Sequence, residues 1–155
     1  MTPRAAELTR LLGLIPPPRG GAYREFWRSP SAPGGRAAST SIWFLLDRGE
    51  FSRWHRVDAD EIWTHLEGSA LELWTWDGDA APERVTLGPA DGGGALPVSV
   101  VPAGRWQAAR PIGGPALCGC TVAPGFTFTG FSLLSGLPDA AARLRERHAA
   151  SAGLL

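Results

Sequence analysis

A series of short segments with a period of two is the feature that most constrains the fold. Between residues 39 and 134, apolar or aromatic residues recur at every second position, and turns such as Asp47-Arg48-Gly49 and Asp77-Gly78 separate the segments. No helical pattern lies between them, which argues against βαβ units and favours an antiparallel β sandwich or barrel. The predicted strands are residues 39–46, 51–57, 61–66, 70–76, 83–87, 97–101, 106–110, 115–122 and 126–134.

Helical segments are predicted at the two ends of the chain. Thr2-Pro3 combines an N-cap hydroxyl with a proline at the first helical position, which indicates a helix over about residues 3–15. The segment from about 138 to 150 is rich in Ala and Arg and has no β-branched residue, so a second helix is expected there. No linker divides the chain, and its length of 155 residues predicts one domain, residues 1–155.

Composition excludes several classes of function. All 15 basic residues are Arg, which excludes Schiff-base chemistry on a lysine and a lysine-dependent phosphate loop. They balance 15 acidic residues without a basic cluster, so nucleic acid is not an expected partner. The longest apolar stretch, Ile42 to Leu46, is too short to cross a bilayer, and a cytoplasmic location is predicted. Cys118 and Cys120 lie two apart on a predicted strand, and we interpret them as reduced, buried residues.

Two motifs with defined spacing point to the chemistry. The first contains Gly49, His55, Val57, Glu61 and Gly68, and it resembles the first signature of the cupin superfamily, in which a His-x-His pair and a glutamate lie between two glycines. The second signature is a proline, a glycine and a histidine. The corresponding run in this sequence is Pro102-Ala103-Gly104-Arg105-Trp106-Gln107.

In cupins these motif positions bind a divalent metal, but two of the four ligands differ in this chain. Val57 stands in place of the second histidine and Gln107 in place of the last one. One imidazole, one carboxylate and one neutral amide make a poor site for zinc or iron. We therefore expect no cofactor, and a divalent metal would bind only weakly through His55, Glu61 and Gln107.

Five ordered runs, spread over about residues 6–135, are similar to one small cupin family, cupin_5, long catalogued as a domain of unknown function. The resemblance implies an all-β fold, an antiparallel jelly-roll barrel over about residues 20–135 with short terminal helices. It also implies a homodimer and a shape like that of sugar-nucleotide epimerases. Arg19 and Thr64 depart from the usual family pattern, in which an acidic residue and a histidine are common at these positions. His65 lies one place after Thr64 and therefore on the opposite face of the strand from it. The five runs are residues 20–25, 38–42, 54–63, 101–107 and 121–126.

The predicted site is a pocket inside the barrel. It combines the catalytic candidates His55, Glu61 and Gln107 with four ligand-binding candidates. An aromatic ring beside a few convergent polar groups suits a carbohydrate-like small molecule. The four ligand-binding candidates are Trp63, Tyr23, Glu25 and Arg53.

The predicted activity is isomerisation or epimerisation next to a carbonyl group, without a metal. His55 would remove the C–H proton, and the Glu61 carboxylate beside it would raise its pKa toward roughly 7. Gln107 would donate a hydrogen bond to the enolate oxygen, and Trp63 would stack on the sugar. Two alternatives remain open: a cupin that binds a small molecule without turnover, and a weakly metal-dependent cupin enzyme.

Overall fold

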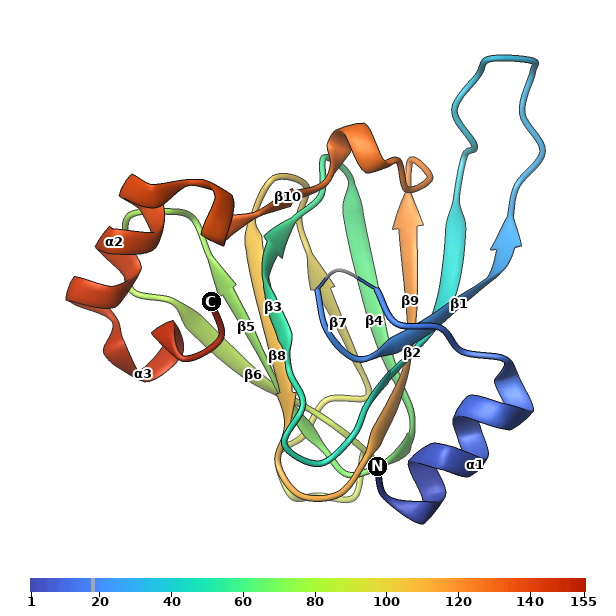
Figure 1. Ribbon diagram of the computed structural model, residues 1–155, viewed down its shortest axis with the longest axis horizontal. Coiled ribbons are helices and arrows are strands. Elements are labelled where there is room, and N and C mark those ends of the chain that lie inside the picture. The colour runs from blue at the N-terminus through green and yellow to red at the C-terminus, as the bar shows by residue number, and fades with distance from the viewer. Residues whose placement is uncertain (18) are drawn as a thin grey trace.

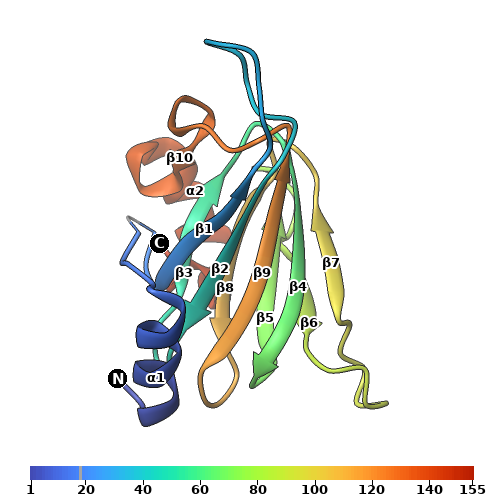
Figure 2. The ribbon, with the colours of Figure 1, turned by 90° about the vertical axis from the view of Figure 1, so that its right-hand side faces the viewer.

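A computed structural model of the chain describes residues 1–17 and 19–155. It is mostly β, with two antiparallel five-stranded sheets facing each other (Figures 1 and 2). The first sheet has the order β1-β2-β9-β4-β7 and the second β10-β3-β8-β5-β6. The strands are β1 (Ala22–Arg28), β2 (Thr40–Leu46), β3 (Ser52–Arg56), β4 (Asp60–Gly68), β5 (Leu71–Trp76), β6 (Glu83–Leu87), β7 (Val98–Val101), β8 (Trp106–Pro111), β9 (Ala116–Ala123) and β10 (Ser132–Leu133).

The eight predicted strands between residues 39 and 122 agree with β2 to β9 to within about two residues at each end. The segment 126–134 was predicted wrongly as a strand. It contains the 3₁₀ turns η1 (Phe128–Gly130) and η2 (Leu134–Gly136), with only the two-residue β10 between them. The strand β1 was missed because its residues lack clean alternation, and its pairing with β2 shifts register between Glu25 and Trp27.

The N-terminal helix α1 (Pro3–Leu12) begins as predicted, with the Thr2 hydroxyl accepting a hydrogen bond from the Ala5 N–H. It ends earlier than the predicted residue 15, because Gly13 adopts a left-handed conformation that terminates the helix. Ala5 and Leu8 pack against Leu45 of β2, which holds α1 against the first sheet (Figure 2).

The C-terminal segment forms two helices, α2 (Pro138–Arg147) and α3 (Ala149–Ala152), instead of one. They cover the outer face of the second sheet (Figure 1) and pack on Trp54, Trp76 and Trp106. The indole N–H of Trp54 donates to the Ser151 carbonyl at 2.8 Å, so the end of the chain is fastened to β3.

The main core lies between the two sheets. Phe44, Trp63, Leu71 and Leu73 are fully buried there, together with Cys118 and other members of β9. Gly68 at the end of β4 has a φ of 89°, and a Cβ at this position would lie 2.1 Å from the Pro115 carbonyl oxygen. Only glycine fits this close approach, which explains the second glycine of the motif.

The described strands divide into two sheets and do not close into one continuous barrel. His55 and Glu61 were expected side by side, but they belong to different sheets, because residues 57–59 carry the chain from β3 in one sheet to β4 in the other. No helix among the described residues is long and apolar enough to cross a membrane.

Candidate functional site

A cavity of about 300 Å³ lies on the inner face of the first sheet. Strands β1, β2, β4 and β9 form its floor, and the loop before β1 and the segment after β9 complete its walls. The lining combines two arginines, two carboxyl groups, a phenol and three phenylalanines with smaller residues. The lining residues are Pro17, Arg19, Tyr23, Glu25, Arg28, Thr40, Ile42, Glu61, Cys120, Val122, Phe126, Phe128 and Phe131.

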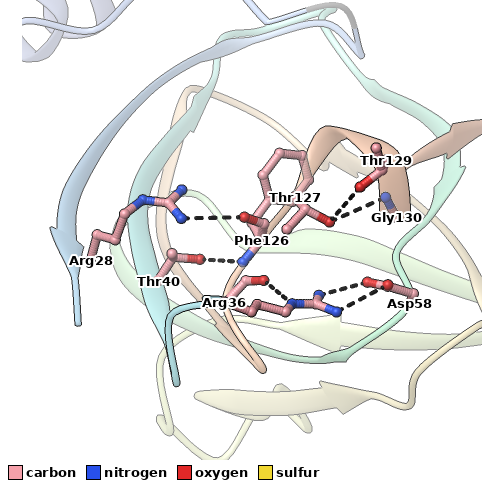
Figure 3. Close-up of polar contacts among 9 residues, drawn as sticks. Arg28, Arg36, Thr40, Asp58, Phe126, Thr127, Thr129 and Gly130 are labelled. Carbon is pink, nitrogen blue, oxygen red and sulfur yellow. Dashed lines mark hydrogen bonds and ion pairs between the residues drawn. The ribbon is translucent and has the colours of Figure 1, made fainter. Parts of the chain in front are cut away.

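The phenylalanine-bearing segment after β9 is held in place by polar contacts with three other parts of the chain (Figure 3). The Phe126 N–H donates to the Thr40 hydroxyl at 2.9 Å, and Arg28 donates to the Phe126 carbonyl at 3.5 Å. Arg36 donates to the Gly125 carbonyl at 2.7 Å and pairs with Asp58 through both terminal nitrogens. These contacts bring the three phenylalanines over the cavity.

A chain of hydrogen bonds links the two sheets behind the cavity. The Trp63 indole N–H donates to Gln107 Oε1 at 2.8 Å, and Gln107 Nε2 donates to Glu61 Oε2 at 2.6 Å. All three side chains are buried. The two bonds use the Gln107 oxygen and one of its two amide N–H groups. Gln107 does not belong to the cavity lining, so it holds the carboxyl group of Glu61 in place instead of offering a donor to a ligand.

Glu61 combines deep burial with access to the cavity. It is 1% exposed, yet it belongs to the cavity lining. Burial raises the pKa of its carboxyl group, and the charge of Arg19 and the hydrogen bonds from Gln107 and Cys120 oppose this effect. A carboxyl group of this kind is suited to accept or donate a proton nearer to neutral pH than an ordinary glutamate.

His55 has a different environment from the one expected. It is fully buried and does not belong to the cavity lining. Its Nδ1 lies 2.7 Å from the Arg53 carbonyl oxygen and its Nε2 lies 3.4 Å from Arg19 Nη1. Donation from Nδ1–H to the carbonyl leaves Nε2 to accept from the guanidinium, which assigns a neutral ring with the proton on Nδ1.

The expectation that a carboxylate raises the pKa of His55 is wrong. Burial, and then the positive charge of Arg19, lower the pKa of this imidazole to about 3. The charged group in contact with the imidazole is Arg19, whereas the Glu61 carboxyl group is bonded to Gln107. His55 therefore remains neutral at physiological pH and is too weak a base for the role predicted for it.

The cupin metal positions do not fit a divalent cation in this chain. The one imidazole nitrogen of His55 that is able to coordinate faces a guanidinium, and Val57 supplies no ligand atom. The Gln107 oxygen already accepts from Trp63. Within residues 1–17 and 19–155, no group of three or more His, Cys, Asp or Glu side chains is arranged to hold a metal ion.

The four ligand-binding candidates divide into two pairs. Tyr23 and Glu25, both on β1, line the cavity. Trp63 does not line it: the ring is buried in the core, with its centroid 5.7 Å from that of Phe44. The Arg53 side chain is exposed, and this residue contributes its backbone carbonyl to His55 instead.

Several cavity residues were missed from the sequence. Arg28 and the three phenylalanines come from segments whose position depends on the packing of the whole fold. One sequence feature could have indicated Arg19 as a site residue: it directly precedes the paired glycines Gly20-Gly21, which permit a tight turn. Cys118 and Cys120 are buried and form no disulfide, as predicted, and burial raises the pKa of both thiols, which disfavours the nucleophilic thiolate.

Comparison with known proteins identifies a matching family and similar structures. The chain matches the family described as Cupin_5: Cupin superfamily (DUF985) over residues 6–134. Protein SO0799 from Shewanella oneidensis is 33% identical, with a TM-score of 0.88 over 97% of this chain and 96% of that one. A hypothetical protein from Leishmania major is 27% identical, with a TM-score of 0.80 over 97% and 95% of the two chains.

More distant structures share the fold alone. Oxalate decarboxylase from Bacillus subtilis is 17% identical with a TM-score of 0.63, and the alignment covers 90% of this chain and 34% of that enzyme. No curated protein gives a significant match.

Proposed function

Since the chain belongs to the Cupin_5 family of the cupin superfamily, we propose that it is an isomerase or epimerase acting on a small carbohydrate-like or hydroxy-carbonyl compound. The ligand occupies the cavity on the first sheet, and the two sheets are the halves of an open cupin jelly roll. The reaction proceeds without a tightly bound metal, since the metal positions hold an arginine-facing histidine, a valine and an engaged amide.

One observation carries this proposal: a buried glutamate with a raised carboxyl pKa reaches the cavity. Isomerisation next to a carbonyl needs a base whose pKa lies near the working pH. Glu61 takes the C–H proton as a carboxylate. In an isomerisation the resulting carboxylic acid returns the proton to the adjacent carbon, while the hydroxyl proton moves to the former carbonyl oxygen. In an epimerisation a second acid, for which the Tyr23 hydroxyl is the candidate, protonates the opposite face of the same carbon, and solvent restores both groups. No proton, electron or other reactant is consumed overall.

The other groups of the site support this proton transfer. The enolate oxygen that forms needs a donor, and the Tyr23 hydroxyl and the Arg19 guanidinium are both in the lining. Gln107 and Trp63 act as positioning residues that hold the Glu61 carboxyl group. His55 does not contact the ligand; its Nε2 accepts a hydrogen bond from Arg19 and so orients the guanidinium.

The test is solvent-proton exchange. The protein is incubated in deuterated water with a panel of sugar phosphates and nucleotide sugars, and deuterium at carbon is measured by NMR. We expect exchange with at least one compound and a loss of ~100-fold or more in Glu61→Gln. Glu67→Gln is the matched control, because Glu67 lies on the same strand and pairs with Arg4 at the surface. Equal exchange rates in the Glu61 and Glu67 variants contradict the proposal.

A non-catalytic binding protein is the second candidate. It is favoured by the burial of His55, which removes the imidazole base from the cavity. Of the two lining carboxyl groups, Glu25 is paired with Arg28, which leaves Glu61 for proton transfer. In that case a compound from the panel binds in the cavity, and no deuterium enters it.

We also propose a homodimer formed through the outer face of the first sheet. Ile62, Leu66, Val98 and Val100 are exposed there on the paired strands β4 and β7. A second copy of the chain would remove this apolar strip from water.

A further inference from the structure

Arg19 is a buried cation that forms no ion pair with any carboxylate among the described residues. It is 6% exposed and lines the cavity, and no carboxylate lies within 4.0 Å of its guanidinium among the described residues. Its Nε is buried with no hydrogen-bond partner in residues 1–17 and 19–155. Buried charges in proteins are paired or bind a ligand, so this side chain indicates a missing partner.

The guanidinium is held in one place. Its central carbon lies 4.4 Å above the Phe44 ring, and Nη1 lies 3.4 Å from His55 Nε2. The backbone is anchored too, because the Arg53 N–H donates to the Arg19 carbonyl at 2.8 Å. A cation fixed in this way binds an oxyanion without the loss of side-chain freedom that a surface arginine would suffer.

The other charges of the cavity do not neutralise Arg19. Arg28 and Glu25 pair with each other through two contacts of 2.8 Å, so together they add no net charge. Glu61 feels the charge of Arg19, but its carboxyl group is bonded to Gln107 and forms no ion pair with the guanidinium within 4.0 Å. The remaining walls are largely apolar, with Ile42, Val122 and the phenylalanines, so they supply no counter-charge.

We propose that the ligand of this cavity carries an anionic group, a carboxylate or a phosphate, and that this group binds to the guanidinium of Arg19. The inference rests on the proposed function only in taking this cavity as the ligand site. With a volume of about 300 Å³, the cavity suits a small hydroxy acid or phosphate ester.

The test compares three probes with a shared skeleton: glycerol, glycerate and glycerol 3-phosphate. Binding is measured by calorimetry and by the shift in unfolding temperature, at constant ionic strength in a buffer free of carboxylate and phosphate. We expect at least one anionic probe to bind the wild-type protein about 10-fold or more tightly than glycerol, because hydrogen bonds to charged groups are the strong ones. The preferred probe separates a carboxylate ligand from a phosphate ligand.

The variants assign the effect to one residue. Arg19→Gln should weaken binding of the anionic probe by about 10-fold or more. Arg48→Gln, in the exposed turn after β2, removes the same charge away from the cavity and should leave binding unchanged. Arg19→Lys keeps the charge and should retain part of the binding, which provides a second measurement if Arg19→Gln does not fold.

Two results overturn the inference: anionic probes that bind no better than glycerol, or equal losses in the Arg19 and Arg48 variants. Both are distinct from failure of the proposed function. Anion binding through Arg19 without deuterium exchange refutes the isomerase and leaves the anion site. Deuterium exchange that is as fast in Arg19→Gln as in the wild type refutes the anion site and leaves the isomerase.

Discussion

The neutral state of His55 makes stability depend on pH in a way that the structure specifies. The imidazole pKa is 6.5 in the unfolded chain and about 3 in the folded one. Between these values the unfolded state binds a proton that the folded state does not, so the stability that His55 contributes above pH 6.5 is lost as the pH falls. Each pKa unit corresponds to about 1.4 kcal/mol, which predicts a loss of about 2 kcal/mol at pH 5 and roughly 5 kcal/mol as the limit near pH 3.

His55→Gln isolates this contribution, because glutamine does not titrate and keeps an acceptor for Arg19. The free energy of unfolding of both proteins is measured by urea denaturation at pH 7.5, 6.0 and 5.0. The advantage of the wild type over the variant should shrink by about 2 kcal/mol between pH 7.5 and 5.0. The difference at pH 7.5 measures the cost of the substitution apart from titration.

The comparison between the two proteins also corrects for Glu61. Its pKa is raised in the fold, so its contribution to stability has the opposite sign and increases as the pH falls. This contribution is present in both proteins and cancels in the difference to first order. Parallel stability curves from pH 7.5 to 5.0 would show that His55 gains its proton equally in both states, and would refute the buried neutral imidazole.

Further predictions follow from the same geometry. If Glu61 is the base, deuterium exchange should decline on acidification at a higher pH than an ordinary carboxylate would allow, which a pH–rate profile measures. Gly68→Ala should lower the free energy of unfolding by about 2 kcal/mol or more in urea denaturation, because of the positive φ and the Pro115 carbonyl. Thr2→Ala should cost about 1 kcal/mol in the same assay through loss of the N-cap. Elemental analysis after dialysis against chelator should find no stoichiometric metal, and sedimentation at micromolar concentration should find a dimer.

Interactions between residues close in the sequence are sufficient to predict much of this fold. Side chains alternate between the two faces of a strand, so the period of two located eight strands without any tertiary information. Thr2-Pro3 specified the start of α1 because capping involves only neighbouring residues. The motif spacing also identified Glu61 and Gln107 as neighbours inside the molecule. In the structure Gln107 Nε2 lies 2.6 Å from Glu61 Oε2.

Properties that depend on distant partners were beyond the sequence pattern. The pKa of His55 is set by burial and by Arg19, which lies 36 residues earlier in the chain and meets the imidazole only in the folded protein. Trp63 was expected in the pocket together with Glu61, yet the inner face of β4 includes both the packed core, where Trp63 lies, and the cavity, which Glu61 lines. The segment after β9 lines the cavity because Arg28, Arg36 and Thr40 fasten it there. Periodicity describes one strand at a time, whereas charge state and cavity shape arise from the packing of several.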